Sequence, residues 1–159
     1  MKNITLTVNK AYVYDEVAKT TAYAGAKMMV EDANAYERIF TTDEDRQLLE
    51  RFWVETCNVV TNHFKPFLIT LGAQPVSHGV DLTRNYSAGL ELSESFDESL
   101  TESINTSLFS FFVSLIVSKW FAVANKPEAE SYAVGAAAIM DDVMKMIYYR
   151  KRPMRADYE

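Results

Sequence analysis

A long apolar helical pattern between Ser95 and Asn125 constrains this chain more than any other feature. Within it, apolar side chains recur every three or four residues, which is the spacing of one face of an α-helix. They are Leu100, Ile104, Leu108, Phe111, Phe112, Leu115, Ile116 and Phe121. From Leu108 onward, apolar residues extend almost all the way round the helix. A helix of this kind lies inside a core, in a subunit interface or in a membrane.

The membrane interpretation fails on length. A spanning helix needs about 20 consecutive apolar residues. Here Lys119 interrupts the run and serines punctuate it, so its uncharged part covers only Leu108 to Ser118. The first ten residues, MKNITLTVNK, also lack the apolar segment of a secretory signal. The single cysteine, Cys57, cannot form an intramolecular disulfide, which fits a reducing compartment. From these features together we expect a cytosolic chain with no membrane partner.

The N-terminal half predicts a strand and two helices. Residues 4–8 alternate apolar and polar side chains, as a half-buried strand does, and a helix is expected over residues 10–29. The acidic run 41–45 supplies capping oxygens and negative charge for a second helix. We expect this helix to end near Phe64, because Pro66 stops the pattern.

Residues 66–94 predict an extended hairpin or projecting loop between the second and third helices. Short apolar segments alternate there with Gly and Pro. It is the longest expected non-helical stretch, and such excursions commonly contact partners.

The C-terminal half predicts two antiparallel helices joined by a short turn. Ser95 and Glu98 form a candidate capping box for the first helix. The second begins near Asn125 with Pro127 in its first turn, and its inner face is expected to carry Ala133, Ala136, Ala137, Met140, Val143, Met144 and Ile147. The fold class is therefore mainly α: one four-helix bundle-like domain over residues 1–153, with a short N-terminal strand, the extended segment 66–94 and a C-terminal tail over 154–159.

Charge is unevenly distributed along the chain. The net charge is −6, whereas the last ten residues contain Arg150, Lys151, Arg152 and Arg155 and are basic. An acidic body argues against broad nucleic-acid binding. The basic tail could contact an acidic neighbour or a phosphate backbone, or its cations could simply complement a helix C-terminus.

The sequence offers little enzyme chemistry. His63 and His78 are its only histidines, and neither stands in a metal or nucleophile motif. Glu-x-x-His pairs, phosphate-binding loops and dinucleotide-binding turns are all missing from the sequence. We therefore expect no catalytic residues, no metal and no cofactor. Nine Phe, nine Tyr and two Trp instead suit either an aromatic core or an assembly interface.

Two segments of the chain carry a resemblance to a known family. They are Thr42 to Phe52, and Ser107 to Trp120 followed by a helix that ends Tyr148-Tyr149-Arg150-Lys151-Arg152-Pro153. This layout resembles tailed-phage head-tail connector (adaptor) proteins over residues 41–153. The chain departs from that family in having a strand and a helix before Thr41, so a tail-completion or other neck ring protein is an alternative.

The resemblance implies a structural virion protein in the phage neck, made in the host cytoplasm. Its subunits would form a homo-oligomeric ring, dodecameric when assembled, between the portal protein and the tail or other neck proteins, close to the channel DNA. It implies contacts through two groups of residues: Gly72, Gln74, Val76, His78, Arg84 and Tyr86 in the extended segment, and Tyr148, Tyr149, Arg150, Lys151, Arg152 and Arg155 in the tail. A soluble helical binding module of non-viral function is the other alternative.

Overall fold

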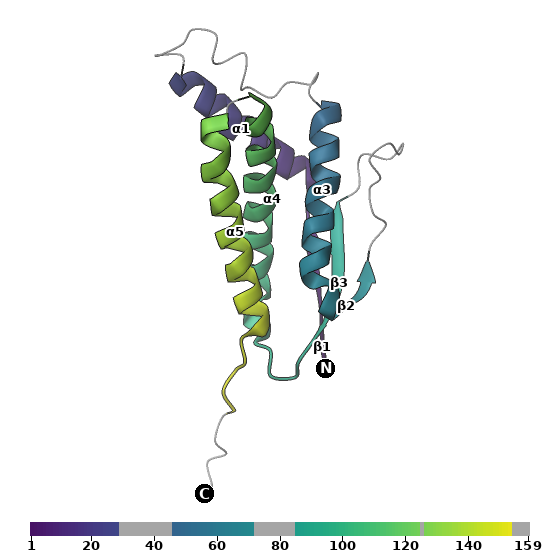
Figure 1. Ribbon diagram of the computed structural model, residues 1–159. Helices are drawn as coiled ribbons and strands as arrows, with labels where there is room; N and C mark the ends of the chain where they lie inside the picture. Colours follow the sequence, from purple (N-terminus) through teal and green to yellow (C-terminus); the bar gives the residue numbers. More distant parts are fainter. Residues whose placement is uncertain (29–45, 72–84, 125, 154–159) are drawn as a thin grey trace, which may run out of the picture.

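The computed structural model describes residues 1–28, 46–71, 85–124 and 126–153 (Figure 1). Its elements, in chain order, are β1 (Lys2–Val8), α1 (Lys10–Met28), α3 (Arg46–Phe64), the 3₁₀ turn η2 (Lys65–Phe67), β2 (Leu68–Leu71), β3 (Tyr86–Leu92), the 3₁₀ turn η3 (Glu98–Leu100), α4 (Thr101–Ala124) and α5 (Lys126–Tyr148). The predicted fold class is confirmed: the described residues form four α-helices, an N-terminal strand and a small strand region between α3 and α4. The expected acidic opening at residues 41–45 lies outside the described residues.

The strands form one antiparallel sheet with β3 in its centre, in the order β1-β3-β2. In β1, Ile4, Leu6 and Val8 are buried while the intervening residues are exposed, as the alternating pattern predicted. Leu6 lies opposite Ala88 of β3 in the register of the sheet. An antiparallel sheet can bury one face and leave the other in water, and this sheet does so.

The strand pair expected within residues 66–94 is present as the antiparallel pair of β2 and β3, but β3 does not project from the body. The side chains of Tyr86, Ala88, Leu90 and Leu92 are buried, so β3 belongs to the core. β3 lies in the core because it pairs with β1 along all seven residues of each strand. Only its pairing with β2 has the hairpin character that the sequence indicated, with a register shift between Leu68 and Thr70.

Helix α4 is the central element of the molecule. It contacts α5 on one side and α1, α3 and β1 on others (Figure 1). The segment Glu98–Val123 is long and apolar enough to cross a membrane by length and composition alone, so the inference from length against a spanning helix is wrong. Packing against α5, α1, α3 and β1 accounts for its apolar composition, and Lys119 within it pairs with Glu55 of α3 at 2.9 Å. Helix α4 is thus the core helix of the fold.

The predicted capping box at Ser95 and Glu98 is wrong. The Ser95 amide donates to the Ser93 hydroxyl at 3.3 Å, whereas the Asp97 carboxylate accepts from the Ser99 amide at 3.1 Å. Asp97 therefore caps the short turn η3, and α4 begins only at Thr101. Aspartate is as good an N-cap as serine, so Ser95 and Asp97, two residues apart, were both candidates, and Asp97 makes the capping bond.

The core joins the sheet to the helices through aromatic rings. Trp53 of α3 and Tyr86 of β3 both lie against Phe112 of α4, with centroid distances of 4.8 Å and 5.6 Å. One ion pair is also buried, between Lys10 at the start of α1 and Glu50 of α3. The fold thus holds α4 between α5 and the layer formed by α3 and the sheet (Figure 1).

Candidate protein interface at one end of the molecule

The C-terminal end of α5 exposes two neighbouring tyrosines. Tyr148 and Tyr149 are 53% and 52% exposed, and the Tyr148 ring meets Phe67 of η2 edge-on at a centroid distance of 5.3 Å. Arg150 donates to the carbonyl oxygen of Ile147 at 3.2 Å, so its cation complements the helix C-terminus. The helix-end interpretation of the basic tail is therefore confirmed for Arg150.

The chain beyond α5 is held against the body. The Lys151 amide donates to the Ser95 carbonyl oxygen at 2.8 Å, which ties the tail to the segment before α4. A hollow forms beside this contact, lined by Lys2, Glu94, Phe96, Lys151 and Arg152 among others. The basic tail is thus placed at a defined position through Pro153.

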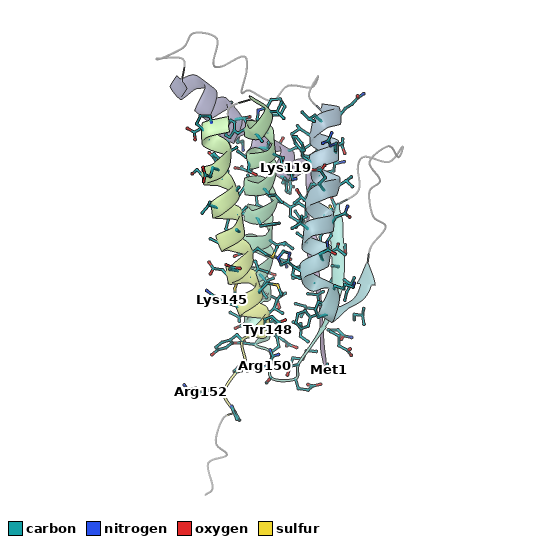
Figure 2. The ribbon with its side chains drawn as sticks, viewed as in Figure 1. Met1, Lys119, Lys145, Tyr148, Arg150 and Arg152 are labelled. Carbon is teal, nitrogen blue, oxygen red and sulfur yellow. The ribbon has the colours of Figure 1, made fainter. Side chains whose placement is uncertain are left out.

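The start of β1 and the residues around β2 reach the same end. A second hollow is lined by Met1, Phe67, Ile69 and Arg150 among others. Met1 is 68% exposed and Ile69 51% exposed. Figure 2 shows Met1, Tyr148, Arg150 and Arg152 together at this end. We call this region the basal surface. Its apolar and aromatic members are Met1, Ile69, Tyr148 and Tyr149; Tyr148 joins it through Phe67, and Tyr149 lines a neighbouring hollow with Asp97 and Lys145. Its basic members are Lys2, Arg150, Lys151 and Arg152, and its acidic members are Glu91 and Glu94.

The basal surface carries charges of both signs, because the exposed Glu91 and Glu94 line the same hollows as the basic side chains. Glu94 is paired with the N-terminal ammonium group, so its charge is offset. Hydrogen bonds from the Ser99 hydroxyl and amide hold the pKa of Asp97 below its usual value, and the nearby Lys151 and Lys2 act in the same direction. The lowered pKa keeps Asp97 ionised, so the surface offers a partner both cations and carboxylates beside its apolar and aromatic side chains.

Five of the twelve predicted interface residues meet on the basal surface: Tyr148, Tyr149, Arg150, Lys151 and Arg152. Gly72, Gln74, Val76, His78, Arg84 and Arg155 lie outside the described residues. Tyr86 corrects the prediction, because its side chain is fully buried and its hydroxyl lies 3.1 Å from that of Thr61. Burial raises the pKa of Tyr86 to about 12. It is a core residue of β3 and cannot contact a partner in this fold.

Sequence reasoning did not include Met1, Lys2 and Ile69 in the site. Lys2 and Ile69 belong to β1 and β2, and Met1 precedes β1, so all three are distant in sequence from the tail. A signal existed for the first two, because the alternation in residues 4–8 predicted a strand that had to pair with something. The sequence did not indicate that this partner was β3, whose end leads into the segment beside the tail.

The described residues include one cysteine, Cys57, and one histidine, His63. Burial raises the pKa of the Cys57 thiol to about 12, so this cysteine stays protonated at neutral pH. His63 is exposed, and its Nδ1 lies 2.9 Å from the Val59 carbonyl oxygen. Within residues 1–28, 46–71, 85–124 and 126–153, no group of three or more His, Cys, Asp or Glu side chains could hold a metal ion.

Comparisons with known proteins give no match: neither a protein-family model, nor a curated protein, nor a solved structure is similar to this chain.

Proposed function

We propose that this protein is a structural subunit of a tailed-phage neck, a head-tail connector that forms a ring between the portal and the tail. The basal surface is its docking face on the portal. The observation that carries the proposal is the gathering of exposed Met1, Ile69, Tyr148 and Tyr149 with basic residues at one end of a helical body. Single exposed apolar residues are ordinary, whereas a cluster of them marks an interaction site.

The residue types of the basal surface support a protein partner. Tyrosine, methionine and arginine are enriched in protein interfaces, and aromatic and arginine side chains dominate their binding energy. Tyr148 and Tyr149 each combine an apolar ring with a polar hydroxyl, so they bind without leaving a buried polar group unpaired when the partner supplies one hydrogen bond. Lys151 and Arg152 supply cations that can pair with carboxylates of a partner.

The same surface would also serve the two alternatives. A tail-completion or other neck ring protein uses it against a different layer of the neck. A monomeric binding module uses it against a single partner and forms no ring. Oligomeric state and binding to a portal ring therefore separate these functions, and both are measurable on the purified chain.

The proposal is tested by co-sedimentation with the purified portal ring of the same phage. The test variant is Tyr149→Ala/Arg152→Glu, and the matched control is Tyr12→Ala, which removes a tyrosine that is 65% exposed on α1. We expect the control to bind like the unmodified protein and the double variant to bind at least about tenfold more weakly, since loss of interface anchors costs more than 1 kcal/mol each. Unchanged binding by the double variant would show that the basal surface is not the docking face.

A further inference from the structure

Helix α5 has an outer face that no other described element covers. The helix packs on α4 through Ala136, Met140, Val143 and Ile147, and it lies at one flank of the molecule (Figure 1). Val134, on the opposite side of the helix, is 65% exposed. Ala133 and Ala137, which the sequence placed on the inner face, are exposed as well. Half of this helix is therefore available to a partner.

The outer side of α5 is uncharged in its middle and acidic on both sides of that middle. Residues 131–140 contain no charged side chain. Glu130 precedes this stretch, Asp141 and Asp142 follow it, and Lys145 lies about one turn further on. We call Glu130, Val134, Ala138, Asp141 and Asp142 the outer α5 face; all five are exposed.

Gly135 adds a second observation in the same stretch. A Cβ at this position would meet nothing within 4 Å, and no described glycine has a positive φ. Glycine inside a helix lowers stability relative to alanine, so a reason for it is expected, and neither crowding nor backbone conformation in the described chain supplies one. Close approach of another chain would supply that reason.

The opposite flank carries a face of matching charge. On α3, Arg51, Asn58 and Asn62 are exposed on the side away from the core, and Lys65 of η2 follows them. Arg51 is 65% exposed at its side chain. Glu55, on the same side, pairs with both Arg51 at 3.1 Å and Lys119 at 2.9 Å, so these three side chains together carry one net positive charge. We call Arg51, Asn58, Asn62 and Lys65 the outer α3 face, which is basic at both ends and uncharged between Glu55 and Lys65.

We propose that the outer α5 face of one copy packs in parallel on the outer α3 face of the next copy. Both helices run in the same direction, on opposite sides of α4 (Figure 1). The rise from Glu130 to Asp142 is roughly 18 Å, and that from Arg51 to Lys65 is roughly 21 Å. Acidic positions of one copy therefore meet basic positions of the next within side-chain reach. Val134 and Ala138 then cover the uncharged middle of the outer α3 face.

This pairing has the geometry that a ring requires. The two faces are different surfaces on opposite flanks, so the contact is heterologous and repeats from copy to copy until it closes. The inference rests on the proposed ring function and names its lateral contact, while the basal surface stays available to the portal. Complementary charges at both ends fix the register of the two helices.

The test is a site-directed cross-link in the full chain. The double variant Asn58→Cys/Ala138→Cys is treated with a short bis-maleimide, alone and on the portal ring. The native Cys57 does not react with the maleimide because it is buried. We expect a ladder of cross-linked multiples from the double variant and none from either single variant. Circular dichroism checks that all variants keep the helical content of the unmodified protein.

Three results would overturn the inference. A dimer from Ala138→Cys alone would show that α5 pairs with itself. Rings by light scattering without a ladder would place the lateral contact elsewhere and leave the ring function standing. A protein that forms no ring, alone or on the portal, would remove the ring function and this contact together. A second test uses charge reversal. The single variant Glu130→Lys should weaken ring formation about tenfold, and adding Arg51→Glu to it should restore ring formation, as expected for one coupled charge pair.

Discussion

At the residue scale, the buried pair of Lys10 and Glu50 is the most consequential polar contact. The two residues are only 4% and 5% exposed. Removing one partner leaves the other charge buried and unpaired, so we expect Glu50→Gln to lower the free energy of unfolding by about 3–5 kcal/mol. Replacing both, as in Lys10→Met/Glu50→Leu, should recover most of that loss. Urea unfolding of the three proteins decides this, and equal losses in the single and double variants would contradict it.

Glu55 makes the free energy of unfolding depend weakly on pH in the acidic range. Hydrogen bonds from Lys119 and, less strongly, from Arg51 hold its pKa below the ordinary value of 4.5. Its stabilisation is therefore complete above that value and is lost as the pH falls through the lowered pKa. Because the carboxylate is 38% exposed, we expect Glu55→Gln to cost only about 0.5 kcal/mol at pH 7, and less at pH 3. A cost in urea unfolding that grows toward pH 3 would have the wrong sign.

At the element scale, Gly135 makes α5 less stable than an alanine at the same position would. We expect Gly135→Ala to raise the free energy of unfolding of the unassembled subunit by about 0.5–1 kcal/mol, because alanine restricts the unfolded chain and nothing nearby obstructs its methyl group. Ala138→Gly, at an exposed position of the same helix, is the matched control and should lower it by a similar amount. Thermal unfolding measures both. A loss of stability in Gly135→Ala would reveal a constraint inside the subunit.

The elements that sequence predicted well are those specified by local signals. The end of α3 follows from Pro66, which comes directly after it, and the end of α5 follows from the periodicity of its apolar residues. Both ends fall close to the expected residues. The start of α4 was misplaced because Ser95 and Asp97 are both good caps, and neighbouring contacts of Ser95 decided between them. The position of β3 depended on pairing with β1, whose residues lie 78 to 90 positions earlier, and local pattern does not encode that pairing.

The candidate site was predictable to the same degree. Tyr148 to Arg152 form a contiguous aromatic and basic run, so they were found directly. Met1 and Ile69 join them only through the sheet. Tyr86 was assigned to a loop because the Gly- and Pro-containing stretch before it suggested an irregular segment, and Gly89 interrupts the apolar pattern of its strand.

At the scale of the whole molecule, the proposed contact surfaces lie on different sides of the body. The basal surface lies at one end of the helices, whereas the outer α3 and α5 faces lie on the two flanks (Figures 1 and 2). A ring subunit needs this division, since lateral contacts join equal copies and an end contact joins the ring to the next layer. The proposed connector role and the proposed lateral contact therefore use different parts of the same body.

The most direct measurement is the solution mass of the purified protein, alone and mixed with the portal ring, by light scattering with negative-stain imaging. We expect a closed ring in at least one of these conditions, visible as added density beneath the portal. A monomer at every concentration that adds nothing to the portal ring would contradict the connector role and would favour a monomeric binding module.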